Sequence, residues 1–328
     1  MVTAAVQEKL KHLPESPGIY QMLNADGMII YIGKSKCLKK RVSSYFVPEP
    51  RWEKAKKMAP FIRNIEYVVT DTHLEAMLLE CSLIKSIRPY FNVMMKHDEK
   101  YVYLELGQDN RKSPLGISSV KTEESFGPLR SKGRLEELIQ GMRYLYPLVK
   151  RRSGRYGLFY HSLPEAMDAE SYQKNRCILR EVCTDPSAMA AFIVETECAM
   201  KQAARRQKYE LALKYRNLTA ALRYLEKGLN TYQKLMGSDI IYTVPLSEGH
   251  KMFYIRNGLV MGAKKVMTAE WEQKNNFADE VRKQIMEVEA PIQDKESVDY
   301  RSIVLTELAD ADENAVTYLS GDNGIVNK

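Results

Sequence analysis

Short apolar runs alternate with turn residues at the start of the chain. Residues 18–23 and 28–33 are rich in aromatic and β-branched side chains, and residues 24–27 (Asn-Ala-Asp-Gly) between them tolerate positive φ. This pattern predicts a β-hairpin. Apolar residues are consecutive in the second run, which favours a central strand buried on both faces. A third strand is predicted at residues 65–70.

Helical spacing of apolar residues follows each of these strands. Helices are predicted at residues 1–12, 35–46 and 51–58. Another should start at His73, capped by Asp71 or Thr72 and stopped before Pro89. The apolar stripe expected on this last helix comprises Leu74, Met77, Leu78, Ile84 and Ile87. The prediction is an α+β domain over residues 1–105, with a three-stranded mixed, mainly antiparallel sheet flanked by helices.

The periodicity divides the rest of the chain into three segments. Residues 106–186 form a basic middle region, and residues 187–230 are strongly helical with a break near Gln207 and Lys208, which predicts an antiparallel helical hairpin. Residues 231–328 predict a small C-terminal α/β region, in which two strands surround a turn at Asn257 and Gly258 and a polar, acidic tail follows.

Composition is that of a globular protein with room for two or three modest domains. The 328 residues are 45% hydrophobic and 28% charged, and their net charge of +7 hints at an anionic partner. The amino terminus lacks the apolar core of a signal peptide, and no apolar run approaches the ~18 residues of a membrane span. We therefore expect a cytoplasmic protein. The five cysteines are odd in number and scattered, which argues against a disulfide scaffold.

A dense basic segment follows the hairpin directly. Residues 34–57 contain nine Lys or Arg and only two acids, Glu49 and Glu53. A solvated helix face is the ordinary explanation of such a segment, but its place after a tyrosine-bearing hairpin favours contact with phosphates. The residues predicted to bind DNA are Lys36, Lys39, Lys40, Arg51, Lys54, Lys56 and Lys57.

The hairpin also carries a motif. Gly-Ile-Tyr at 18–20 and Tyr-Ile-Gly at 31–33 are the defining pair of the GIY-YIG endonuclease superfamily. Seven positions in order resemble the N-terminal nuclease domain of the UvrC/Cho family of bacterial excision repair: Tyr20, Tyr31, Lys34, Arg41, Tyr45, Glu80 and Asn92. The resemblance implies a phosphodiester hydrolase that incises damaged double-stranded DNA in nucleotide excision repair.

Phosphodiester hydrolysis requires an activated water and positive charge for the phosphate. A single carboxylate, Glu80, suits Mg²⁺ or Mn²⁺, because Mg²⁺ keeps most of its waters in proteins. Tyr31, whose usual pKa is about 10, is implied by the resemblance to take the proton of the water. A cation with Lys34 and Arg41 nearby would favour its phenolate.

The resemblance implies further roles for the remaining positions. Arg41 would contact the scissile phosphate, Tyr20, Lys34 and Tyr45 would position it, and Asn92 would brace the site. Each residue type alone also has a structural explanation, such as a tyrosine packed at a strand end or an acid on a solvated helix face. Two histidines, His73 and His97, are not needed by this mechanism and are expected at the surface. Glu75 is expected as a charge in the first helical turn.

Residues 125–148 resemble the UvrC segment that leads to a cysteine region. That region of the family holds an iron–sulfur cluster on four cysteines. Here Lys150 and Arg151 stand where the first cysteine is expected, and only Cys177, Cys183 and Cys198 follow. No iron–sulfur cluster is therefore expected.

Residues 198–226 resemble the UVR motif, the helical hairpin by which the family docks on UvrB. Asn217 replaces the usual Asp. The alternative is an amphipathic hairpin that buries its apolar stripe within its own chain. The positions that match, and would bind UvrB or a UvrB-like protein, are Met200, Ala203, Ala204, Tyr209, Glu210, Ala212, Arg216, Leu218 and Leu222.

The resemblance extends to residues 250–266 and stops before the family's second nuclease and its helix-hairpin-helix pair. A single active site implies a single incision, on the 3′ side of the lesion if the family's division of labour holds, with weak DNA affinity in the absence of a partner. Two alternatives remain open. One is a non-catalytic protein that docks on UvrB and binds DNA, and the other is a mobile-element nuclease unrelated to repair.

Overall fold

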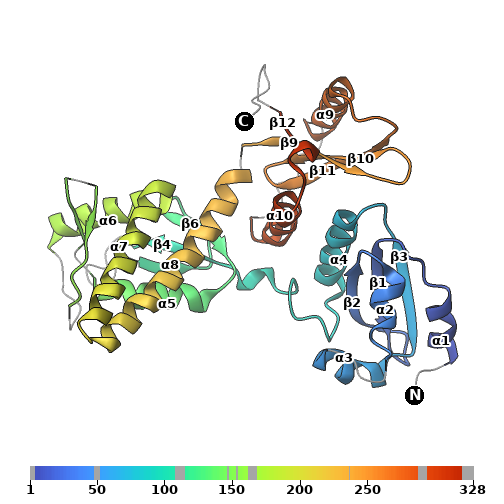
Figure 1. The fold of residues 1–328 in the computed structure, drawn as a ribbon, viewed down its shortest axis with the longest axis horizontal. Helices are drawn as coiled ribbons and strands as arrows, with labels where there is room; N and C mark the ends of the chain where they lie inside the picture. Colours follow the sequence, from blue (N-terminus) through green and yellow to red (C-terminus); the bar gives the residue numbers. More distant parts are fainter. Residues whose placement is uncertain are drawn as a thin grey trace. The chain divides into compact units, whose positions relative to one another are not determined.

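The computed structural model describes residues 4–47, 52–107, 115–145, 148–152, 154–161, 168–235, 237–286 and 294–319. The chain forms two compact units (Figure 1). The first combines Met1–Asp98 with Leu235–Lys328, and the second comprises Glu99–Lys234. The unit boundaries thus differ from the four segments expected from the sequence.

The first unit begins with an antiparallel sheet of β1 (Gly18–Leu23), β2 (Ile29–Ser35) and β3 (Asn64–Val69). The strand order is β2-β1-β3, so β1 is central and β2 lies at the edge. The three-stranded α+β fold is confirmed, but the expectation of a central second strand is wrong. The run of apolar residues in β2 has another cause, because the chain after helix α4 (His73–Ile87) covers its open edge.

That cover consists of Phe91 and Asn92. The Phe91 N–H donates to the Ile30 carbonyl at 2.9 Å. The Asn92 amide acts like a short strand: its Oδ1 accepts from the Ile32 N–H and its Nδ2 donates to the Ile32 carbonyl, both at 2.9 Å. Edge backbone groups that would otherwise need water are thereby satisfied.

Helices α1 (Ala4–Lys11), α2 (Leu38–Ser43), α3 (Glu53–Met58), η1 (Ala59–Phe61) and α4 surround this sheet (Figure 1). Helix α2 is shorter than predicted because the Ser35 hydroxyl accepts from the Cys37 N–H at 2.9 Å and turns the chain first. Helix α4 starts with a capping box between Thr72 and Glu75. It ends at Arg88, which has a φ of 53°, directly before Pro89.

A four-stranded antiparallel sheet completes the first unit, in the order β11-β10-β9-β12. Its strands are β9 (Asp239–Pro245), β10 (His250–Arg256), β11 (Leu259–Val266) and β12 (Val316–Leu319), with η3 (Glu313–Ala315) before the last. The predicted turn is present, since Asn257 and Gly258 have φ of 51° and 74°.

The predicted polar tail is wrong over the described residues, because α9 (Trp271–Met286) and α10 (Asp294–Ala309) cover this sheet. Alternate residues of β9 face opposite sides. Ile241 packs in one cluster with Phe277 of α9, and Ile240 packs in another with Val304 of α10. Both helices are mostly polar, and a few apolar residues at helical spacing bury one side of each against the sheet.

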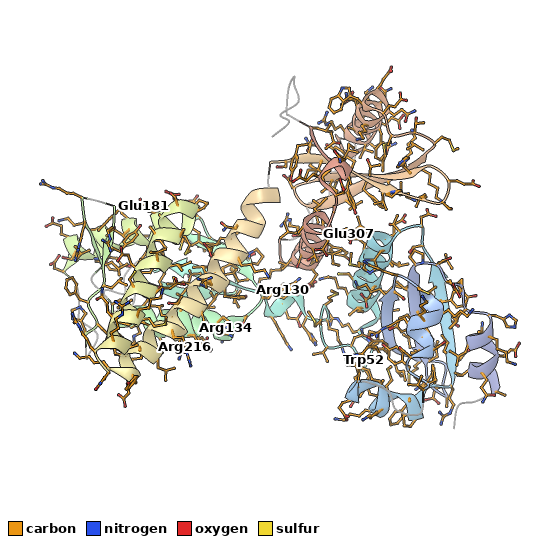
Figure 2. All side chains as sticks on the ribbon, viewed as in Figure 1. Trp52, Arg130, Arg134, Glu181, Arg216 and Glu307 are labelled. Atoms are coloured by element: carbon orange, nitrogen blue, oxygen red, sulfur yellow. The ribbon has the colours of Figure 1, made fainter. Side chains whose placement is uncertain are left out.

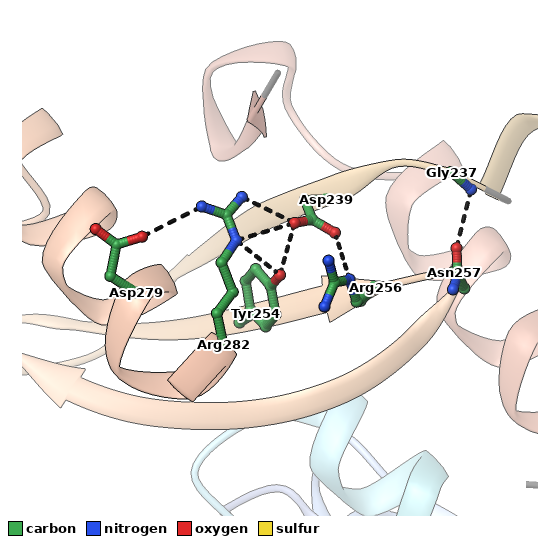
Figure 3. A network of polar contacts seen from close by, with 7 residues as sticks. All are labelled: Gly237, Asp239, Tyr254, Arg256, Asn257, Asp279 and Arg282. Carbon is green, nitrogen blue, oxygen red and sulfur yellow. Dashed lines mark hydrogen bonds and ion pairs between the residues drawn. The ribbon is translucent and has the colours of Figure 1, made fainter. Parts of the chain in front are cut away.

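A network of charged and polar side chains joins α9 to the sheet (Figure 3). Asp239 accepts from the Tyr254 hydroxyl at 2.7 Å and from Arg282 at 2.8 Å, and pairs with Arg256 at 3.1 Å. Arg282 also reaches Asp279 of its own helix at 3.2 Å. At the strand start, the Gly237 N–H donates to the Asn257 side chain at 2.9 Å.

Helix α4 is shared by both sheets of the first unit. Its Leu74, Met77 and Cys81 belong to the apolar cluster that contains β9, β10 and α10. Polar contacts reinforce this packing, since Lys251 of β10 pairs with Glu75 at 2.9 Å. Glu75 therefore caps α4 and also holds the C-terminal sheet, which is more than the first-turn charge expected.

The second unit has one apolar core around the sheet β5-β4-β6. Its strands are β4 (Val102–Leu106), β5 (Leu115–Ser118) and β6 (Ser125–Leu129), preceded by η2 (Asp98–Lys100), and β7 (Val149–Lys150) pairs with β8 (Tyr156–Gly157). Helices α5 (Lys132–Arg143), α6 (Ala169–Thr184), α7 (Pro186–Arg205) and α8 (Tyr209–Leu235) pack on it. The predicted helix break is present, with Gln207 at a φ of 59°.

Among the described residues, no helix combines the length and apolar character needed to cross a membrane.

Gly33 is a position of the first sheet that has no room for a side chain. It lies opposite Tyr20 in the strand register, and an added Cβ would be 2.4 Å from the Tyr20 hydroxyl oxygen. We expect Gly33→Ala to lower the free energy of unfolding by about 1–3 kcal/mol, the usual cost of overpacking, in urea titrations. Gly133→Ala is the control, because a Cβ on Gly133 meets no atom within 4 Å. An equal effect of both substitutions would contradict this account.

Candidate active site

Three tyrosines form the floor of the site. Tyr20 of β1 and Tyr31 of β2 point to the same face, since Tyr31 pairs with Met22, two residues from Tyr20. The ring centroids of Tyr20, Tyr31 and Tyr45 lie 5.8–6.1 Å apart. Tyr20 is 1% exposed and Tyr45 3% exposed, and their hydroxyl oxygens are 2.7 Å apart. The hydroxyls of Tyr20 and Tyr45 are thus hydrogen-bonded to each other.

Arg41 lies above this floor on α2, one turn before Tyr45. Its Nε donates to the Tyr20 hydroxyl at 3.3 Å. Its guanidinium carbon is 4.0 Å from the ring centroid of Trp52 and 5.1 Å from that of Tyr45. The cation therefore lies close to two neighbouring aromatic rings, and its terminal nitrogens make no hydrogen bond with the described residues.

Glu80 supplies the carboxylate from the middle of α4. Its Oε1 accepts from the backbone N–H of Lys34 at 3.1 Å, which ties the helix to the end of β2. Burial raises the pKa of Glu80 to about 6, against the opposing effect of Lys34 and Arg41. A half-buried carboxylate between two cations remains ionised at neutral pH and is suited to binding a further cation.

Lys34 continues the polar chain toward the C-terminal sheet. Its Nζ lies 3.0 Å from His73 Nε2, and burial lowers its pKa. The other nitrogen of His73 is 3.7 Å from Glu307 of α10 (Figure 2). His73 is only 19% exposed in its side chain, so the expectation of a surface histidine is wrong. His97 is also half-buried. Sequence reasoning missed His73 because the partner, Glu307, lies on a distant segment.

The surroundings of Tyr31 favour its neutral form in the protein alone. Burial raises its pKa, the neighbouring Tyr45 raises it further, and the charge of Lys54 opposes the shift. The Lys54 ammonium lies 5.6 Å from the Tyr31 ring centroid. In the protein alone Tyr31 is therefore a neutral phenol.

The seventh matched position, Asn92, lies beside the site rather than in it. The residue is 7% exposed and both polar atoms of its amide are bound to the backbone of Ile32, between Tyr31 and Gly33. It fixes the strand from which Tyr31 projects.

The basic segment surrounds the site with exposed charge. All of its predicted DNA-binding lysines that the structure describes are exposed: Lys36, Lys39, Lys40, Lys54, Lys56 and Lys57. Arg51 lies outside the described residues. Lys39 pairs with Glu15 and Lys56 with Glu53, at 3.2 and 3.0 Å. Exposed pairs of this kind open readily toward a stronger anion.

The predicted partner-binding positions on the helical hairpin of the second unit differ in solvent exposure. Ala203, Leu218 and Leu222 are buried in the unit's own core. Met200 and Ala212 are half-buried. The exposed positions are Ala204, Tyr209, Glu210 and Arg216, of which Tyr209, at the start of α8, is 69% exposed. Figure 2 labels Arg216 on the same helix.

The buried Tyr20 hydroxyl predicts a pH-dependent stability. Burial raises its pKa well above the usual range, so the folded state holds the proton more tightly than the unfolded chain. This contribution is complete below the ordinary tyrosine pKa of about 10 and is lost as pH rises beyond it. Tyr20→Phe should cost about 1 kcal/mol at pH 8, one buried hydrogen bond, and the difference from wild type should shrink at more alkaline pH.

Urea midpoints at pH 8 and about pH 10.5, just above the ordinary tyrosine pKa, test this. The control is Tyr90→Phe, because Tyr90 is 82% exposed. An unchanged difference between wild type and Tyr20→Phe at the two pH values would refute the assignment.

Comparisons with known proteins agree with this geometry. A family model of the UvrC-like GIY-YIG domain matches residues 16–93. The UvrABC system protein C of Acetivibrio thermocellus is 32% identical over 278 residues, covering 78% of this chain and 44% of the relative. The corresponding protein of Oenococcus oeni is 29% identical over 302 residues, covering 87% of this chain and 47% of the relative. The chain thus spans about half the length of these relatives.

Among solved structures, the magnesium-bound GIY-YIG N-terminal endonuclease domain of UvrC from Thermotoga maritima is 37% identical. It is matched over 100% of its own length and 28% of this chain, with a TM-score of 0.26. The family model covers the residues that form the site. Residues 16–93 therefore match a UvrC-like GIY-YIG domain, and most of the chain is similar to about half the length of UvrABC system protein C.

Proposed function

We propose that this protein is an endodeoxyribonuclease of nucleotide excision repair that makes one incision, 3′ to a lesion, and is recruited by UvrB. The observation that supports it best is the gathering of one carboxylate, Glu80, and the cations Lys34 and Arg41 around Tyr31, from three separate elements. Similarity to UvrABC system protein C supports the repair context. Action in the cytoplasm, where the chromosome of a bacterium lies, belongs to the same proposal.

The residues present fit a hydrated divalent cation. No group of three or more His, Cys, Asp or Glu that could enclose a metal occurs in the described parts of the chain. Mg²⁺ is commonly held by one or two carboxylates, with waters and phosphate oxygens completing its shell. Glu80 suits that role, because one carboxylate oxygen is fixed by Lys34 and the other accepts no hydrogen bond from the described residues. Mg²⁺ or Mn²⁺ would supply positive charge to the phosphate and lower the pKa of an adjacent hydroxyl.

Each side chain of the site would have a separate role in hydrolysis. Arg41, which lies close to the rings of Tyr45 and Trp52, presents its terminal N–H groups to the scissile phosphate and stabilises the charge that develops there. Tyr31 orients the attacking water and takes its proton, directly or through a relay of hydroxyls. Because burial keeps Tyr31 neutral in the protein alone, its activation depends on the DNA- and cation-bound state. Tyr20, Lys34 and Tyr45 position these groups.

Substrate choice would come from a partner rather than from base readout. The exposed lysines around the site contact phosphates, which carry no sequence information. The hairpin of α7 and α8 is the candidate docking element for UvrB. Its buried stripe belongs to the unit's own core, so docking would use the exposed residues at the start of α8, Tyr209 among them.

Incision of a defined substrate tests the nuclease. A 5′-labelled duplex with one bulky adduct, incubated with UvrA, UvrB and Mg²⁺, should be cut once, 3′ to the adduct. Tyr31→Phe and Glu80→Ala should each reduce the rate by about 100-fold or more, the usual contribution of general acid–base or charge-stabilising groups.

The matched controls are Tyr318→Phe, 54% exposed, and Glu66→Gln, on the exposed side of β3. Both should cut like the wild type. No incision under any divalent metal, with UvrB binding retained, would leave a docking protein without catalysis. Metal-dependent cutting of undamaged or branched DNA without UvrB would instead favour a nuclease unrelated to repair.

UvrB docking has its own test. Tyr209→Ala should weaken binding of UvrB by about tenfold, as expected for an exposed aromatic interface residue, without changing thermal unfolding. Leu218→Ala is the contrasting variant, because Leu218 is 3% exposed and its loss should lower stability. Binding measured by calorimetry that is unaffected by Tyr209→Ala would place the interface elsewhere.

A further inference from the structure

Trp52 is the exposed aromatic residue beside Arg41, and the proposed hydrolysis does not use it. It precedes α3 as its N-terminal cap residue and is 42% exposed, whereas Tyr20 and Tyr45 are almost fully buried. Its ring centroid is 4.0 Å from the Arg41 guanidinium and 6.0 Å from the Tyr45 ring. Figure 2 labels it at the edge of the nuclease fold.

The indole has two different surfaces. One covers the guanidinium of Arg41, so that the aromatic ring and the cation are in contact. The Tyr45 ring lies beside it as well, and 42% of the residue's surface is open to solvent. Because Arg41 is the group that meets the scissile phosphate in the proposed function, the open part of the indole lies close to the bond that is cut.

The surroundings of Trp52 favour an anionic strand. Helix α3 carries Lys54, Lys56 and Lys57, all exposed, and a single acid, Glu53, which is already paired with Lys56. A basic surface combined with an exposed aromatic ring is the arrangement by which proteins hold single-stranded nucleic acid, with the backbone on the cations and a base on the ring.

We propose that Trp52 binds a nucleobase next to the scissile phosphate by stacking. This inference rests on the proposed function and specifies the substrate further. A base can stack on the indole only when it has left its neighbour in the duplex, which costs least where pairing is already disrupted. The site would thus select DNA in which a nucleotide flanking the cut is unpaired.

The two tryptophans of the chain make a direct measurement feasible. Trp271 lies at the start of α9 with 43% exposure, so Trp271→Phe leaves Trp52 as a single fluorescent reporter. Titration of this protein in EDTA, which prevents cutting, with a short duplex containing two unpaired nucleotides should quench the fluorescence. A fully paired duplex of the same length should quench it less.

A cycle of substitutions separates stacking from an effect on Arg41. Trp52→Leu should weaken binding to the unpaired duplex about tenfold, the usual loss of one stacked base, and Trp52→Phe should restore much of it. Abasic nucleotides placed one at a time on either side of the incised bond remove the stacking partner. At the position that contacts Trp52, the abasic substrate should bind wild type and Trp52→Leu equally. Trp271→Leu is the control of matched exposure and should bind normally.

Two results would overturn the inference. If Trp52→Leu weakens binding equally on every abasic substrate, the indole acts only by orienting Arg41. If Trp52→Leu binds and cuts like wild type, the indole has no role. Both results leave the nuclease assignment intact. Failure of the wild-type protein to cut the adduct-bearing duplex in the presence of UvrA, UvrB and a divalent metal would instead reject the proposed function itself, and this inference with it.

Discussion

The hydrogen bond between the hydroxyls of Tyr20 and Tyr45 is the constraint from which the site follows. A phenol buried away from water is costly unless its polar atom is bonded, and these two phenols satisfy each other at 2.7 Å. Tyr20 can lie flat across the hairpin only because Gly33 opposite it has no side chain. Arg41, one turn from Tyr45 on α2, then meets the same hydroxyl. The signature glycine and the tyrosines are thus parts of one packing unit.

Helix α4 links this packing unit to the rest of the first unit. Its polar side gives Glu80 to the site and its apolar side gives Leu74, Met77 and Cys81 to the core beneath the C-terminal sheet. The capping box fixes the rotation of the helix at its start. Because the carboxylate and the apolar residues are on one rigid element, the position of Glu80 depends on packing that involves residues far away in sequence.

Local sequence patterns predicted most of the nuclease fold. The turn at residues 24–27, the Thr72 cap and the break at Gln207 each have a local chemical cause, and each is present in the structure. The strand order was not predictable in the same way. Whether β1 or β2 is central depends on which of them β3 joins, and that is a long-range contact.

The same distinction holds for the site. A motif identified the tyrosines, Arg41 and Glu80, but not the contacts that hold them. Trp52 was overlooked because a tryptophan in a basic segment has no fixed spacing from Arg41. Likewise, the polar composition of the C-terminal region concealed two helices, since a few well-spaced apolar positions such as Phe277 and Val304 suffice to bury one side of each.

The bidentate amide of Asn92 has a consequence beyond strand geometry. An edge strand with unpaired backbone groups is a template onto which another chain can add, and β2 is both an edge and the carrier of Tyr31. Asn92 occupies both the Ile32 N–H and the Ile32 carbonyl. An added strand therefore cannot form hydrogen bonds with β2 directly beside Tyr31. Asn92 thereby keeps the strand that carries Tyr31 from pairing with another chain at this point.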